Sequence, residues 1–111
     1  VIVGSGKYIT KYNSNGNKIW DITTPNRGRD NNIFAEYYDV SALATTSDGS
    51  VIVGSGKYIT KYNSNGNKIW DITTPNRGRD NNIFAEYYDV NAISTYKNNS
   101  YKKLIEEDDN D

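Results

Sequence analysis

One 40-residue segment occurs twice in this sequence without a single change. Residues 1–40 recur at residues 51–90, so the period is 50 residues. The linker at residues 41–50 returns in altered form at residues 91–100. A repeat of this length is typical of solenoids, propellers and other arrays, whose units bury their apolar faces only against neighbouring units. We therefore divide the chain into a first repeat at 1–50, a second repeat at 51–100 and a tail at 101–111.

Turn signals divide each repeat into short runs that are typical of β-strands. In the first repeat these runs lie at residues 1–3, 7–12, 18–23 and 40–46, and they are β-branched or alternate between apolar and polar side chains. The dipeptides Asn15-Gly16 and Asp48-Gly49 are strong hairpin signals. No helix-period pattern of useful length occurs before residue 100. The pattern predicts an all-β protein with two four-stranded antiparallel units per chain.

Two parts of the sequence are less regular. We expect a loop over residues 26–32, followed by residues 33–38, which are apolar enough to pack down as a short strand or a single helical turn. The tail at 101–111 ends in an acidic run, and we expect it to be disordered. A short helix over residues 102–107 is the alternative.

Composition excludes several classes of function. The 111-residue chain has 13 Lys and Arg against 14 Asp and Glu, so it lacks the basic character that nucleic-acid binding requires. No apolar run approaches the ~20 residues of a membrane span. The chain has no Cys and no His, which excludes disulfides, thiolate metal sites and a Ser/His/Asp triad. We therefore expect no nucleic-acid or membrane partner, no cofactor and no enzymatic activity.

The order of strands and turns resembles a known family of repeats. It is similar to the short β-propeller repeat of prokaryotic surface and secreted proteins. The residues that carry this resemblance are Asp39, Ala42, Leu43, Ala44, Asp48, Gly49, Val51, Val53, Gly54, Ile59, Lys61, Tyr62, Gly66, Asn67 and Trp70. The spacing Gly16-x-x-x-Trp20 is also similar to the docking motif of quinoprotein propeller repeats.

The resemblance implies that each repeat contributes one four-stranded blade to a β-propeller. The small-residue strand at 40–46 would then lie near the ring axis, and the strand that contains Trp20 would lie at the outer edge. Residues 26–38 match neither pattern. The Asp, Glu and Arg sites of quinoprotein enzymes have no counterpart in this sequence, so the resemblance implies no quinone cofactor.

An arginine-rich loop is the sharpest candidate for a ligand site. The candidate ligand-binding residues are Arg27, Arg29 and Asp30, with their copies Arg77, Arg79 and Asp80. Arginine binds carboxylates and phosphates through two parallel hydrogen bonds. The alternative is that these residues are solvated charges at the rim. Replacing the arginines by Ser would then change the free energy of unfolding by less than about 1 kcal/mol.

Aromatic residues are frequent in each repeat. We expect Trp20, Trp70, Tyr12 and Tyr62 to pack between neighbouring blades rather than to bind a ligand. The neighbours Glu36, Tyr37 and Tyr38 either line a sugar-binding groove or pack between blades. The Asn- and Asp-containing turns carry at most one carboxylate each, so we expect no calcium or other metal site.

A count of strands predicts self-association. Residues 40–46 supply the first strand of the second unit, whereas residues 90–96 form a first strand with no partner in the chain, and Val1–Val3 lacks the strand that should lie beside it. Such edges pair with another chain. Propellers have about 4–8 blades, and four blades from a dimer would be too tightly curved for blades this rich in Tyr and Trp. Two blades per chain therefore predict a cyclic homotrimer or homotetramer, with six or eight blades.

The expected function is a non-enzymatic repeat scaffold or binding module with itself as partner and a glycan or protein as ligand. One alternative is an engineered repeat or a fragment without a natural ligand. Another is a glycan-binding, lectin-like propeller. The exact identity of the two 40-residue segments fits either recent duplication or deliberate copying.

Overall fold

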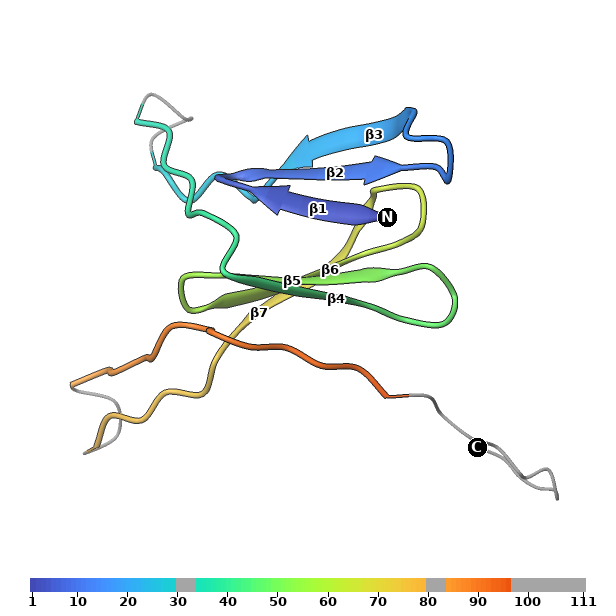
Figure 1. The fold of residues 1–111 in the computed structure, drawn as a ribbon. Helices are drawn as coiled ribbons and strands as arrows, with labels where there is room; N and C mark the ends of the chain where they lie inside the picture. The colour runs from blue at the N-terminus through green and yellow to red at the C-terminus, as the bar shows by residue number, and fades with distance from the viewer. Residues whose placement is uncertain (30–33, 80–83, 97–111) are drawn as a thin grey trace, which may run out of the picture.

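The computed structural model describes residues 1–29, 34–79 and 84–96. This part of the chain forms two antiparallel sheets and contains no helix (Figure 1). The strand order is β1-β2-β3 in the first sheet and β4-β5-β6-β7 in the second. The predicted all-β, antiparallel fold class is therefore confirmed. The first sheet, however, has three strands rather than four.

The strands follow the runs predicted from the turn signals. In the first sheet, β1 spans Ile2–Ser5, β2 spans Tyr8–Tyr12 and β3 spans Lys18–Thr23. In the second sheet, the strands are β4 at Ala42–Thr45, β5 at Val51–Ser55, β6 at Tyr58–Tyr62 and β7 at Lys68–Thr73.

Short turns set the register of each hairpin. Gly6 joins β1 to β2 with a φ of 57°, a left-handed conformation that favours glycine. Between β2 and β3, the side-chain oxygen of Asn13 accepts hydrogen bonds from the amides of Asn15 and Asn17. The second repeat forms the same turns with the same register, which places Lys61 opposite Trp70 as Lys11 lies opposite Trp20.

The segment after β3 leads from the first sheet to the second, and its described residues, 24–29 and 34–41, form no strand. The amide of Thr24 donates to the carbonyl of Lys7, and the amide of Val40 donates to the carbonyl of Gly6, each at 2.8 Å. Phe34 is exposed. The expectation that residues 33–38 form a strand or helical turn is thus wrong for residues 34–38. Phe34 forms only an isolated bridge with Arg29, and the amide of Arg27 donates to the carbonyl of Glu36, so this part of the segment is a loop. Residue 33 lies outside the described residues.

Residues 90–96 run beside β4 (Figure 1). The Ser41 hydroxyl donates to the carbonyl of Val90 at 2.7 Å, and the Thr95 hydroxyl donates to the carbonyl of Thr45 at 2.5 Å. No strand is assigned to this segment, although the sequence predicts one. The tail at 101–111 and the alternative helix at 102–107 lie outside the described residues.

Each sheet has two faces, since alternate residues of a strand point to opposite sides. We call one the valine face. In the second sheet it comprises Val51, Val53, Ser55, Tyr58, Thr60, Tyr62 and Asp71, and in the first sheet it comprises Val1, Val3, Ser5, Tyr8, Thr10, Tyr12 and Asp21.

We call the opposite side the tryptophan face. In the first sheet it comprises Ile2, Ile9, Lys11, Trp20 and Ile22, and in the second sheet it comprises Ile52, Ile59, Lys61, Trp70 and Ile72.

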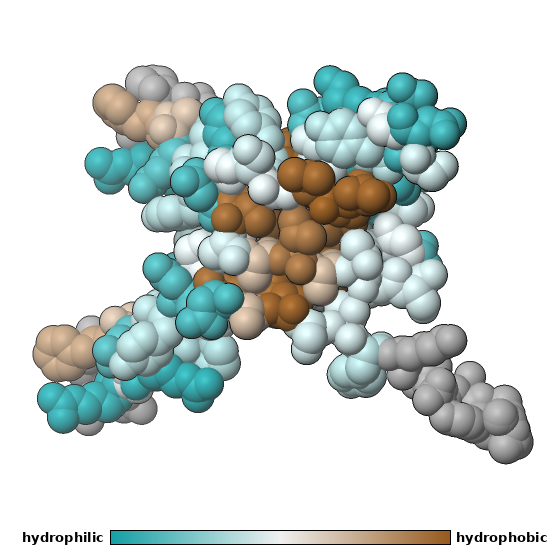
Figure 2. Space-filling view, in the orientation of Figure 1, coloured by the Kyte–Doolittle hydropathy of each residue, from teal (hydrophilic) through white to brown (hydrophobic). Residues whose placement is uncertain are grey.

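The core lies where the tryptophan face of the first sheet packs on the valine face of the second. Its buried members are Ile9, Val51, Val53 and Tyr62. Partly buried residues around them are Ile2, Trp20, Ile22, Val40 and Leu43. Figure 2 shows apolar residues gathered at the centre of the face on which β1 and β4 lie. Within the described residues, no helix has the length and apolar character needed to cross a membrane.

Candidate functional site

Trp20 joins the two sheets. Its indole Nε1 donates a hydrogen bond of 3.0 Å to the carbonyl of Ser64, in the turn between β6 and β7. The ammonium of Lys11 donates to the same carbonyl at 3.2 Å. The indole also covers Gly66, where a Cβ atom would lie only 3.1 Å from the ring. A tryptophan of one repeat thus packs against the turn of the next.

Arg27 makes the second connection between the sheets. Its guanidinium forms a bidentate pair with the carboxylate of Asp71, with N–O distances of 2.5 and 2.9 Å. The guanidinium carbon also lies 3.6 Å from the ring centre of Tyr58. The hydrogen bond from Arg27 lowers the pKa of Asp71, and the same bond raises the pKa of Arg27.

Tyr62 is buried beneath these connections. Its hydroxyl has no hydrogen-bond partner among the described residues, and burial raises the pKa of Tyr62 to about 12. Thr60, on the same face, donates to the Asp71 carboxylate at 2.8 Å and thereby orients it toward Arg27. The valine face of the second sheet therefore combines apolar packing with one oriented carboxylate.

The two repeats expose opposite faces although their sequences are the same. Val51 is 0% exposed, whereas its copy Val1 is 79% exposed. On the tryptophan face the order is reversed. Ile9 is buried whereas its copy Ile59 is only partly buried, and Trp20 and Ile22 are partly buried whereas their copies Trp70 and Ile72 are exposed. The first repeat thus leaves its valine face open, and the second repeat leaves its tryptophan face open.

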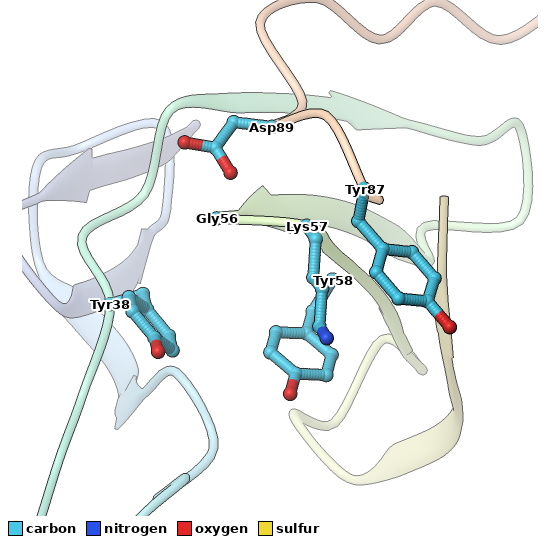
Figure 3. Close-up of a pocket in the computed structure, with 6 residues that line it drawn as sticks. All are labelled: Tyr38, Gly56, Lys57, Tyr58, Tyr87 and Asp89. Atoms are coloured by element: carbon cyan, nitrogen blue, oxygen red, sulfur yellow. The ribbon is translucent and has the colours of Figure 1, made fainter. Parts of the chain in front are cut away.

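A pocket with a volume of about 260 Å³ lies at the turn between β5 and β6. Figure 3 shows Tyr38 on one side and Tyr87 on the other side of Lys57 and Tyr58. Gly56 and Asp89 complete its lining. Because Tyr38 precedes β4 while Tyr87 and Asp89 follow β7, the pocket combines residues of both repeats.

The first repeat carries most of a second pocket. The ammonium of Lys7 lies 4.2 Å from the ring centre of Tyr37 and 5.5 Å from that of Tyr8. The equivalent distances from Lys57 to Tyr87 and Tyr58 are 4.1 and 5.5 Å. In the part of the chain that the structure describes, however, no atom lies within 4 Å of a Cβ built at Gly6, whereas Tyr38 covers Gly56.

The structure separates the residues proposed as a ligand-binding loop. Arg27 is paired with Asp71. Arg29 and Arg79 are exposed and each forms an isolated β-bridge, with Phe34 and Phe84 respectively. Arg77 is exposed, and its amide bonds to the carbonyl of Glu86 as that of Arg27 bonds to Glu36. Asp30 and Asp80 lie outside the described residues.

The residues predicted to pack between blades also differ between repeats. Trp20 lies in the contact between the sheets and Tyr62 is buried there. Tyr12 is only partly buried and Trp70 is 38% exposed. Of the residues weighed for a sugar groove, Tyr38 lines the pocket, whereas Glu36 is exposed.

Sequence reasoning did not single out Asp71, Lys57, Tyr58 or Tyr87. A signal for Asp71 was present, because an aspartate in the middle of the apolar run KIWDIT needs a polar partner when that strand is buried. The run Gly-Lys-Tyr after the first hairpin indicated only a turn and a strand. Its neighbours in the pocket come from residues 38 and 87–89, and the sequence gives no indication of that proximity.

The described residues contain no group of three or more His, Cys, Asp or Glu side chains that could hold a metal ion. Comparison with known proteins adds no relative, since no family model, no curated protein and no solved structure matches the chain.

Proposed function

We propose that this chain is a non-enzymatic scaffold whose two sheets are consecutive blades of a β-propeller, completed by head-to-tail association with further chains. The observation that carries this proposal is the opposite exposure of identical residues in the two repeats. The open valine face and the open tryptophan face are the two surfaces that pack together inside the chain. The protein therefore presents both halves of a contact that it already makes once.

Repeating the internal contact gives the contact between chains. Trp70 would donate to the carbonyl of Ser14 of a second chain and cover Gly16 there. Arg77 would pair with Asp21 of that chain. The Thr10 hydroxyl already donates to Asp21 at 2.8 Å, as Thr60 does to Asp71. The carboxylate that would receive Arg77 is thus oriented in advance.

Backbone pairing would extend across the same joint. Inside the chain, β4 pairs with β5 so that Leu43 lies opposite Val53. A shift by one repeat places Ile93 opposite Val3 of the second chain. The segment that would pair is residues 90–96. Its first residue is held in place within the chain, because the amide of Val90 donates to the carbonyl of Gly56 at 2.8 Å. Edges with unpaired backbone groups favour such addition of a strand.

Contacts of this kind are heterologous, and they close into a ring when the rotation between units permits. Each chain contributes two sheets, so the number of blades is even. Propellers have about 4–8 blades, and four blades rich in Tyr and Trp would be too tightly curved, so a trimer with six blades or a tetramer with eight is expected. A ring would present each loop several times, which raises the avidity for a repetitive ligand.

Two variants, each blocking one face, test the proposal by sedimentation velocity. Val3→Lys places a charge on the open valine face, and Trp70→Glu places one on the open tryptophan face. Each variant alone should sediment as a monomer, because each has lost one half of every joint. An equimolar mixture should form a 1:1 dimer and nothing larger, since one intact joint remains between the two variants.

Urea unfolding of each variant shows whether the single chain is still folded. We expect both variants to fold, because Val3 and Trp70 are exposed in the single chain. A wild-type protein that sediments as a monomer at all concentrations would refute the proposal. Dimers of Trp70→Glu alone would indicate a contact between two valine faces and would equally exclude head-to-tail assembly.

A further inference from the structure

The pocket at the turn between β5 and β6 has walls of a particular chemistry. The rings of Tyr38 and Tyr58 are inclined by 32° with centres 6.1 Å apart. The Tyr38 ring covers Gly56, where a Cβ atom would lie 3.4 Å from the ring, at ordinary van der Waals distance. Tyrosine offers an apolar ring face and a hydroxyl that donates and accepts hydrogen bonds. Such walls suit a ligand that has C–H faces and a polar rim.

The charged groups at the pocket balance one another. The ammonium of Lys57 lies over the ring of Tyr87, and the carboxylate of Asp89 is exposed beside Gly56 (Figure 3). The nearby Arg27 is neutralised by Asp71. A phosphate would meet the Asp89 carboxylate, whereas a quaternary ammonium would meet the Lys57 ammonium that already occupies the ring face. A hydroxyl can donate to Asp89 and accept from Lys57.

Because Lys57 lies over the ring of Tyr87 and Arg27 over the ring of Tyr58, we infer that the pocket binds one neutral saccharide ring, stacked on Tyr38 and hydrogen-bonded by Lys57 and Asp89. The volume of about 260 Å³ is below the ~300–1,000 Å³ of pockets for drug-sized ligands, and it suits a single sugar unit. The site is separate from the sheet faces that join one chain to the next.

A second saccharide pocket forms at each joint between chains, and this part of the inference rests on the proposed head-to-tail assembly. Lys7, Tyr8 and Tyr37 repeat the geometry of the first pocket without a tyrosine over Gly6. The matching tyrosine is Tyr88, which is 62% exposed in its own chain. Tyr88 of a neighbouring chain would cover Gly6 as Tyr38 covers Gly56.

The predicted stoichiometry is therefore one saccharide for an isolated chain and two for each chain of the assembly. The test titrates wild-type protein and the monomeric Trp70→Glu variant with methyl glycosides of glucose, galactose, mannose and N-acetylglucosamine, and with short oligomers of each. Saturation-transfer NMR detects binding, and isothermal titration calorimetry counts the sites.

Matched tyrosine variants locate the two sites. In the monomer, Tyr38→Ala should weaken binding about tenfold or more, because it removes one stacking wall, whereas Tyr88→Ala should leave binding unchanged. In the assembly, Tyr88→Ala should reduce two sites per chain to one. If Tyr38→Ala does not fold, Tyr87→Ala tests the same pocket, with Tyr37→Ala as its control.

The outcomes separate this inference from the assembly proposal. If the wild-type protein remains monomeric and binds one saccharide, and Tyr38→Ala weakens this binding, the first pocket is supported and the second pocket is excluded. An assembled protein that binds none of the glycosides would overturn the inference and leave the assembly intact. Binding of inorganic phosphate or choline in place of saccharides, or saccharide binding unaffected by both Tyr38→Ala and Tyr87→Ala, would also overturn it.

Discussion

The indole of Trp20 donates its hydrogen bond to the carbonyl of Ser64, in the turn of the following repeat. Its copy Trp70, in the same sequence context, is exposed on the outer side of the second sheet. The same side chain is therefore a packing residue in one repeat and an open surface in the other. This difference provides a matched pair of variants.

Trp20→Ala should destabilise the single chain, whereas Trp70→Ala should not. Large-to-small substitution of a fully buried Trp costs about 3–5 kcal/mol, and we expect about 2–3 kcal/mol for Trp20 because it is only partly buried. Urea unfolding of both variants in the monomeric state measures this difference. Equal losses of unfolding free energy would show that Trp70 also packs within its own chain.

Arg27→Ser and Arg77→Ser form a second matched pair. The sequence predicted that neither change affects stability, but Arg27 is bonded to Asp71 and stacked on Tyr58. We expect Arg27→Ser to cost about 1–3 kcal/mol, the range for a hydrogen bond to a charged group. Arg77→Ser should cost less than about 0.5 kcal/mol, as is usual for exposed positions. A thermal unfolding scan of both monomeric variants measures the difference, and equal melting temperatures would contradict it.

Local signals in the sequence were sufficient to predict the seven observed strands, although the strand predicted at residues 90–96 is not assigned. Asn-Gly and Asp-Gly turns and β-branched runs act over a few residues, so the hairpins of both repeats were predicted close to their observed positions. Whether a given residue is buried, paired or exposed could not be predicted in the same way. Arg27 and Arg77 have identical flanking residues. Their environments differ because a second sheet follows Arg27, whereas the described residues after Arg77 form no sheet. Because the pocket joins residues 38, 56–58 and 87–89, it depends on packing between repeats, which no local pattern encodes.

The Arg27–Asp71 pair should make stability sensitive to acid. The hydrogen bond from Arg27 lowers the pKa of Asp71 in the folded chain, whereas an unfolded Asp has a pKa of about 3.9. The pair therefore stabilises the fold fully above about pH 4, and this stabilisation is lost as the pH falls through the lowered folded pKa. In the monomeric Trp70→Glu background, the unfolding free energy should fall over this range by more with Asp71 intact than with Asp71→Asn. Asp21→Asn in the same background is the control, because Asp21 has no arginine partner among the described residues of its own chain, and parallel pH profiles for all three proteins would contradict the prediction.

Truncation after Val90 should prevent assembly, whereas truncation after Tyr96 should not. The first removes residues 91–96, which lie beside β4 and would pair with β1 of a neighbouring chain, but it keeps the contacts of Val90 with Gly56 and Ser41. The second keeps the whole segment. Strand addition supplies backbone hydrogen bonds along the length of the added strand, so its loss should convert an oligomer into folded monomers. Sedimentation velocity measures the mass, and circular dichroism checks that the sheets remain. If the chain that ends at Val90 still sediments as a ring, the joint is made by the sheet faces alone and Ile93 has no role opposite Val3. If the chain that ends at Tyr96 is already a monomer, residues 97–111 take part in the joint, and the register derived from β4 and β5 does not describe it.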